Sequence, residues 1–162
     1  MKQITKLLKA LMPRMLDVYV YEHPLSITPV NIPSLVDVDI SINKQNKQYT
    51  FYASHQGVVV NENHVIFENR LGRQLGYVNV PMLANSNTSG PYRGKGIQAL
   101  MLTKIVRHFA AMNEYDRVMV FTYTSNTPMQ HALRKAGYTK LYRAKVYRIA
   151  GLSVYVKKMY EL

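Results

Sequence analysis

The hydrophobic and polar positions of this chain change period about halfway along it. Up to about residue 90, apolar residues mostly alternate with polar ones or form short β-rich runs, which is typical of strands. The proline-rich stretch after residue 23 and the polar stretch 43–48 are expected to be extended and turn segments, and residues 3–12 have helical spacing. Strands are expected in five segments of this half: 16–22, 36–42, 49–54, 58–67 and within 75–88.

Beyond residue 96 the apolar positions follow a helical period. From Ile97 to Met112 they fall at i, i+3, i+4, i+8, i+12 and i+15, which predicts a long amphipathic helix beginning near Gly96. The apolar run 118–124 then predicts a short buried strand of the kind found in parallel sheets.

A second helix is expected directly after that strand. Thr127 is interpreted as its N-cap, Pro128 as its first helical residue and Gln130 as the partner in a capping box. Gly137 is expected to follow its C-terminus. Two final strands, joined through a turn at Ala150-Gly151, complete the chain: 141–149 and 152–160.

This order of elements predicts an α/β fold with a mixed, mostly antiparallel central sheet and flanking helices. The helix beginning near Gly96 follows one strand and precedes another, so its N-terminus is expected at the carboxyl edge of the sheet, where open α/β sheets bind ligands. At 162 residues the chain is expected to form a single domain, 1–162.

Composition excludes several classes of protein. Hydrophobic residues are 48% and charged residues 19% of the chain, as in ordinary globular proteins. No apolar run is long enough to span a membrane, and the basic N-terminus lacks the features of a signal peptide, which favours a cytoplasmic protein. Cysteine is absent, so disulfides, thiolate nucleophiles and thiolate metal sites are excluded. The five histidines show no metal-binding spacing, and no metal is expected.

Charge is strongly asymmetric. Lys and Arg number 21 against 9 for Asp and Glu, a formal net charge of +12, and no acidic residue occurs from Arg117 to Tyr160. Such a field favours an anionic partner: a phosphorylated small molecule, nucleic acid or an anionic membrane surface. A solubilising surface without a specific partner has the same composition.

The stretch PYRGKGI, Pro91 to Ile97, is the clearest candidate for chemistry. A helix N-terminus leaves backbone N–H groups unpaired and carries partial positive charge, so anions bind there. Gly94 and Gly96 allow close backbone approach, and Arg93 and Lys95 add full charges. The spacing matches neither a nucleotide-hydrolase P-loop nor a G-x-G-x-x-G fingerprint.

This turn resembles the pyrophosphate-binding turn of the GCN5-related N-acetyltransferases (the GNAT superfamily), whose pattern is [QR]-x-x-G-x-[GA]. A second feature lies at the right separation: Asn126, followed eleven residues later by the Gly137 of KAGY, is similar to the family's N-x(10)-G-[FY]. The resemblance covers residues 46–162, and residues 1–45 are divergent.

The resemblance implies an N-acyltransferase that transfers an acetyl group from acetyl-CoA to a primary amine by direct attack on the thioester. Thr88 would pair with the pantetheine arm through its backbone, and Asn126 would contact the pantetheine or the leaving group. Five consecutive residues would hold the pyrophosphate through their N–H groups: Arg93, Gly94, Lys95, Gly96 and Ile97.

The sequence departs from the family pattern at three positions. Pro91 stands where Gln or Arg is frequent, and Gln98 stands where a further glycine is common. Leu133 stands where many members have a tyrosine that is proposed to protonate the leaving thiolate, and a leucine cannot do so.

A general base is also required, and His64 and Glu68 are the candidates, with Glu62 nearby. Each of these residue types is more often found on a solvated surface.

Two alternatives remain at this point. The basic C-terminal face, where tyrosines alternate with Arg and Lys on the last strands, would also suit a nucleic-acid-binding module or guide an anionic acceptor. A non-catalytic CoA-sensing module would explain Leu133. By analogy with the family, the exposed final hairpin could form a homodimer.

Overall fold

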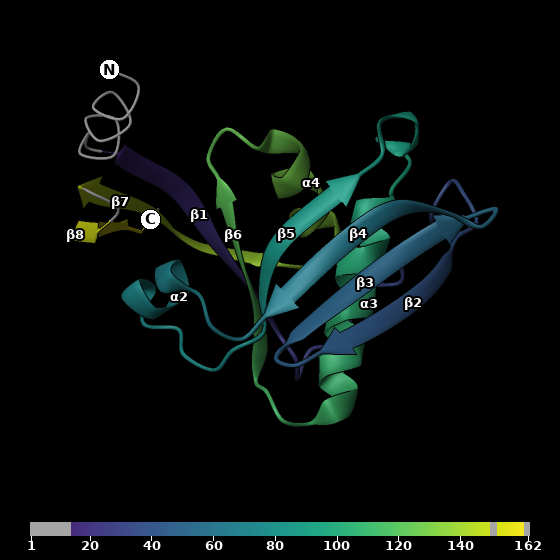
Figure 1. The fold of residues 1–162 in the computed structure, drawn as a ribbon, viewed down its shortest axis with the longest axis horizontal. Coiled ribbons are helices and arrows are strands. Elements are labelled where there is room, and N and C mark those ends of the chain that lie inside the picture. Colours follow the sequence, from purple (N-terminus) through teal and green to yellow (C-terminus); the bar gives the residue numbers. More distant parts are fainter. Residues whose placement is uncertain (1–13, 150–151, 161–162) are drawn as a thin grey trace, which may run out of the picture.

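A computed structural model describes residues 14–149 and 152–160. One eight-stranded sheet, in the order β2-β3-β4-β5-β6-β1-β7-β8, dominates it (Figure 1). Every neighbouring pair is antiparallel except β5 and β6, which confirms the mixed, mostly antiparallel sheet. The strands are β1 Arg14–Pro24, β2 Asp39–Gln45, β3 Gln48–His55, β4 Val58–Ile66, β5 Met82–Thr88, β6 Arg117–Tyr123, β7 Thr139–Ile149 and β8 Leu152–Met159.

Helices cover both faces of this sheet. The helices are α2 Arg70–Leu75, α3 Ile97–Met112 and α4 Thr127–Lys135, with a short 3-10 turn η1 at Gly90–Tyr92. The larger core packs α3 and α4 against one face and contains Phe51, Phe109 and Val120. The smaller core lies on the other face, where Leu75 of α2 joins Val20. No helix of the described ranges has the length and apolarity needed to cross a bilayer.

The helix α3 forms where the 3.6-residue period predicted it. Its apolar stripe is buried against the sheet, and Met101, Ile105 and Phe109 are fully inaccessible to solvent. Burying such side chains gives roughly 1.5–3 kcal/mol each in area terms, so this stripe fixes α3 on the sheet. Its N-terminus is thereby held beside the end of β5 (Figure 1).

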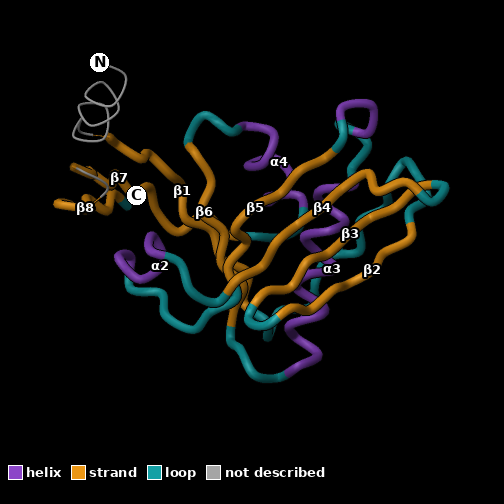
Figure 2. Tube along the Cα trace, in the orientation of Figure 1, coloured by secondary structure: helices purple, strands orange, loops and turns teal. Residues whose placement is uncertain are grey.

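The predicted strands are present, with shifted limits. The turn between β3 and β4 lies at Gln56-Gly57, as expected, and both residues have positive φ. The strand β2 begins three residues later than predicted and continues through part of the polar stretch 43–48, because only Asn46 and Lys47 turn there, Asn46 with φ of 53°. Residues 25–35, expected to be extended, and 36–38, expected to begin a strand, form neither helix nor strand (Figure 2).

One helix was not predicted, one prediction is wrong, and two predictions lie outside the described residues. The helix α2 was not predicted; Asn69 caps it and Gly76, with φ of 93°, ends it. The capping box at Thr127 is wrong, because Asn126 is the N-cap of α4: its side chain accepts a hydrogen bond from the N–H of Met129. The expected helix 3–12 and the Ala150-Gly151 turn lie outside the described residues.

The strand β6 has one parallel and one antiparallel neighbour. It is parallel to β5 but antiparallel to β1, so the parallel character expected for 118–124 holds on one side only. The strand β1 lies between β6 and β7, so residues before 46 contribute an interior strand to the sheet.

Candidate functional site

The two parallel strands β5 and β6 pair over a very short length. Only Met82 with Met119 and Leu83 with Val120 are in register, and the strands then diverge toward their carboxyl ends (Figure 1). Beyond this point Ala84 of β5 is exposed. The sheet therefore opens at the carboxyl edge, where the sequence predicted a ligand.

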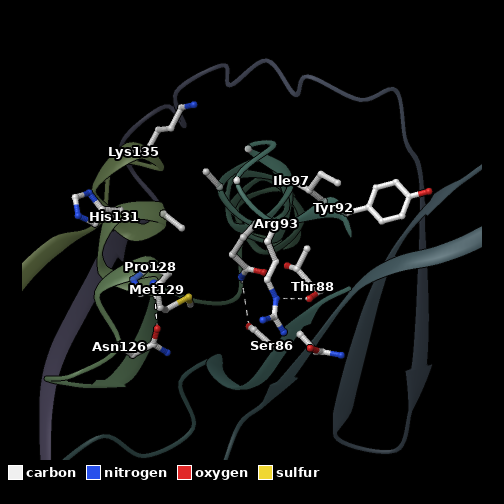
Figure 3. Close-up of a pocket in the computed structure, with 16 residues that line it drawn as sticks. Ser86, Thr88, Tyr92, Arg93, Ile97, Asn126, Pro128, Met129, His131 and Lys135 are labelled. Atoms are coloured by element: carbon white, nitrogen blue, oxygen red, sulfur yellow. Dashed lines mark hydrogen bonds between the residues drawn. The ribbon is translucent and has the colours of Figure 1, made fainter. Parts of the chain in front are cut away.

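A cavity of about 710 Å³ lies at this opening. Its lining comes from the end of β5, the glycine turn, the start of α3 and the exposed side of α4 (Figure 3). Six of the residues predicted to bind the cosubstrate line it together: Thr88, Arg93, Gly94, Gly96, Ile97 and Asn126. Lys95 is the predicted binding residue outside this lining.

The glycine turn has the backbone shape that its sequence requires. Gly94 and Gly96 have φ of 76° and 83°, in the left-handed region that only glycine adopts at low cost. Gly96 is the N-cap of α3, and no side chain of the described residues caps this helix. The first N–H groups of α3 consequently border the cavity without a capping partner, which is the arrangement that binds an anion.

Contacts on both sides hold the turn in place. The Lys95 carbonyl accepts a hydrogen bond of 3.1 Å from the N–H of Leu35, in the segment before β2. Arg93 bends back so that its Nε donates to the Thr88 carbonyl at 2.9 Å (Figure 3). The Nζ of Lys95 lies 5.0 Å from the centre of the Tyr92 ring. The Thr88 carbonyl, expected to pair with pantetheine, is thus bonded to Arg93 in this structure.

Two cavity residues on α4 were not assigned to the site from the sequence. They are His131 and Lys135, and both line the cavity. The Nζ of Lys135 lies 3.9 Å from where a Cβ would stand on Gly96, so a positive charge sits beside the helix N-terminus. The i, i+4 spacing of His131 and Lys135 could have indicated that both lie on one side of α4.

Leu133 lies on the opposite side of that helix. It is completely buried in the larger core, with Ile97 and Tyr138. The position where many family members carry the proposed acid is therefore a packing position here, and it delivers no polar group to the cavity.

The predicted bases do not line this cavity. His64 and Glu62 point to the sheet face opposite α3, since the intervening Asn63 contacts Gln98 of that helix. On that face the Nε2 of His64 lies 3.0 Å from Oε1 of Glu62, and its Nδ1 lies 3.1 Å from the Thr50 hydroxyl.

Glu68 lies farther away. It follows β4 and lines a separate hollow of about 360 Å³ with Gln48 and Thr50. No group of three or more potential metal ligands occurs within 14–149 and 152–160.

Two basic side chains of the C-terminal face contact residues of β1. Arg143 makes a two-pronged ion pair with Asp17, and its guanidinium lowers the pKa of the Asp17 carboxyl. Lys140 lies over the ring of Tyr19, with Nζ 4.7 Å from the ring centre. The carboxylate of Asp17 offsets the charge of Arg143, whereas the neutral ring of Tyr19 leaves the charge of Lys140 unchanged.

Comparison with known proteins gives a clear answer on the fold. No family model matches the sequence, and no curated protein is significantly similar to it. Among solved structures, an acetyltransferase of the GNAT family from Novosphingobium aromaticivorans superposes with a TM-score of 0.58 at 13% identity, over 82% of this chain and 63% of that one. A GNAT-family acetyltransferase from Colwellia psychrerythraea gives 0.56 at 16% identity, over 93% of this chain and 57% of that one.

A GCN5-related N-acetyltransferase from Sphaerobacter thermophilus gives a TM-score of 0.54 at 13% identity, over 99% of this chain and 57% of that chain. The chain therefore has the fold of the GNAT acetyltransferases. It spans about three-fifths of the length of these three structures. Identities this low establish the fold alone.

Proposed function

We propose that this protein is an acetyl-CoA-dependent N-acyltransferase acting on a primary amine. The observation that carries the proposal is the uncapped N-terminus of α3, reached through two left-handed glycines and opening into the 710 Å³ cavity between the diverging strands. This is a site for a negatively charged, elongated ligand, and acetyl-CoA is such a ligand.

In this proposal the pyrophosphate binds the N–H groups of the turn from Arg93 to Ile97. Lys135 adds a positive charge from α4, and Asn126 borders the cavity where α4 begins. The pantetheine arm follows β5 past Thr88 toward the point where β5 and β6 separate. That direction brings the thioester to the gap in the sheet, where an acceptor can approach from the opposite face.

The reaction itself requires no enzyme nucleophile. The neutral amine attacks the thioester carbonyl carbon, a C–N bond forms, the C–S bond breaks and the thiolate leaves. The amine loses one proton and the thiolate gains one. Positioning the two reactants supplies much of such a rate.

We assign the proton acceptor to the pair of His64 and Glu62. Glu62 holds the Nε2 side of the imidazole, as a carboxylate orients a catalytic histidine, and a base can act through water. The pair lies on β4, one strand away from the opening of the sheet, on the face from which the acceptor would come. Glu68, beside a different hollow, has a weaker case.

A CoA-binding protein without turnover is the second candidate. The observation that favours it is the burial of Leu133, which leaves no acid at the position where the family pattern has a tyrosine. In a catalytic protein the thiolate would then leave unprotonated or take a proton from water.

The test begins with calorimetric titration of the protein with acetyl-CoA and desulfo-CoA. Both are expected to bind, and Gly94→Glu is expected to abolish binding, because its carboxylate would occupy the anion site. Gly57→Glu is the matched control: Gly57 also has positive φ, 78°, and open space around it, but lies in the β3–β4 turn. Unchanged binding by Gly94→Glu would refute the site.

Turnover is then measured as release of CoA thiol over a panel of amines. The chain has no cysteine, so a thiol reagent reports CoA alone. Binding without turnover of any amine would favour the sensing protein.

A further inference from the structure

One face of the strands β1, β7 and β8 carries exposed apolar and aromatic side chains. Met15 of β1 pairs with Tyr147 of β7, which pairs with Tyr155 of β8, so the three side chains form one row. They are 50%, 38% and 58% exposed, and the two tyrosine rings lie 5.8 Å apart. These strand ends lie away from α3 and α4 (Figure 1). The row therefore offers apolar surface to a partner outside the described residues.

The next row on this face is basic. Two residues along β7, Lys145 pairs with Lys157 of β8 and with Asp17 of β1. Asp17 is held in its ion pair with Arg143, and Lys157 is exposed. Three basic side chains thus accompany one carboxylate. We call the two rows together, Met15, Tyr147, Tyr155, Lys145 and Lys157, the β1–β7–β8 surface.

The sequence directly before β1 continues both properties. Residues 2–12 lie outside the described ranges and have the sequence KQITKLLKALM. Four aliphatic residues recur at i, i+3, i+4 and i+7, the spacing of one side of a helix: Ile4, Leu7, Leu8 and Leu11. At the same spacing three lysines fall on the opposite side: Lys2, Lys6 and Lys9. A basic amphipathic segment of this kind is typical of binding to a lipid interface.

The β1–β7–β8 surface lies at the edge of the sheet where the cavity opens. The N–H of Thr124, one residue beyond β6, donates to the Asp17 carbonyl at 3.1 Å. Asn126 follows two residues later and lines the cavity. A partner on this surface is therefore at the same edge of the sheet as the cavity.

We propose that residues 2–12 and the β1–β7–β8 surface bind together to an anionic lipid bilayer. The aliphatic side of the segment would enter the acyl boundary, and the tyrosines suit the headgroup level, where their rings are apolar and their hydroxyls polar. The lysines of both parts are attracted to anionic headgroups. A nucleic acid would also attract these lysines, but it has no use for an aliphatic side, so the lipid is favoured. The inference does not depend on acetyl transfer.

The test is co-sedimentation of the full chain with vesicles of phosphatidylcholine alone or mixed with phosphatidylserine. Binding is expected only to the anionic vesicles, and it is expected to weaken as salt is raised. Leu8→Gln is expected to weaken binding at least about fivefold, because it removes an aliphatic side chain from the apolar side of the segment. Thr5→Gln, on the lysine side of the same segment, is the matched control and is expected to bind as the wild type does.

A second pair of variants tests the folded part of the proposed site. Lys157→Ala is expected to weaken binding about fivefold, the usual value of one basic residue near an anionic bilayer. Lys47→Ala is the control, since it removes the same charge from the β2–β3 turn at the other side of the sheet, and it is expected to bind as the wild type does. Circular dichroism checks the fold of each variant.

Three results would overturn the proposal: no binding to the anionic vesicles, wild-type affinity in Leu8→Gln, or equal losses in Lys157→Ala and Lys47→Ala. A labelled single-stranded oligonucleotide is titrated in parallel. If it binds through Lys157 while the vesicles do not bind, the surface is a nucleic-acid site and the lipid proposal is wrong.

Discussion

The variant Gly94→Ala adds one methyl group to the glycine turn. Its effect on protein stability can be measured separately from its effect on ligand binding at the proposed anion site. Gly94 has φ of 76°, and a Cβ built on it has no neighbour within 4 Å. Alanine in this region costs about 1–2 kcal/mol, and the lower entropy of the unfolded chain returns about 0.4–1 kcal/mol. The net loss of stability is therefore about 1 kcal/mol, or about 2–4 °C in melting temperature for a chain of this length.

Gly57→Ala provides the matched comparison. Gly57 has φ of 78° and is equally unobstructed, so both variants are expected to lose the same stability. Only the methyl group on Gly94 borders the cavity. Acetyl-CoA binding is therefore expected to fall at least about tenfold in Gly94→Ala and to stay unchanged in Gly57→Ala. Thermal melts and calorimetry measure the two effects, and equal affinities in both variants would contradict binding of an anion at this turn.

Three further changes test other parts of the structure. Lys135→Ala is expected to weaken acetyl-CoA binding a few-fold and to reduce its salt dependence, because an exposed charge beside Gly96 is lost; calorimetry at two salt concentrations measures this. Leu133→Ala is expected to lower the free energy of unfolding by about 2–5 kcal/mol in urea, since it opens a cavity in the core; a loss below about 1 kcal/mol would mean that this site is not packed. Asp17→Asn is expected to cost about 1 kcal/mol at neutral pH. Because Arg143 lowers the Asp17 pKa below its ordinary 3.8, that contribution is present above pH 3.8 and disappears as the pH falls through the folded-state value, so wild type and variant should converge in acid.

The sequence predicted the elements that depend on hydrophobic periodicity and on the backbone preferences of single residues. The alternation in the first half predicts strands, and the 3.6-residue stripe of α3 predicts a helix. Two glycines directly before that stripe, Gly94 and Gly96, predict a turn with positive φ. The helix α2 was missed because its six residues are too few to show a period, and only its two caps, Asn69 and Gly76, carried a signal.

The surroundings of the proposed base were harder to predict because they depend on pairings between strands. The side of the sheet that His64 faces follows from the contact of the adjacent Asn63 with Gln98 of α3, and no local pattern contains a contact between residues so far apart in the chain. Its contact with Glu62 joins residues i and i+2, which share a face only in a strand. The glycine turn proposed to bind the anion, by contrast, is one contiguous segment, so its sequence alone was enough to predict it.

Gln98 shows how a departure from a family pattern can carry information. A glycine at that position would leave Asn61 and Asn63 buried without their partner on α3, so a polar side chain at 98 is required once two asparagines occupy β4. The three residues form one hydrogen-bonded unit. Gln98 of α3 is 37 positions from Asn61 and 35 positions from Asn63 of β4. Replacing Gln98 alone should therefore destabilise the protein more than replacing it together with both asparagines by apolar residues. That comparison distinguishes a coupled unit from three independent contacts, because independent contacts would give additive losses.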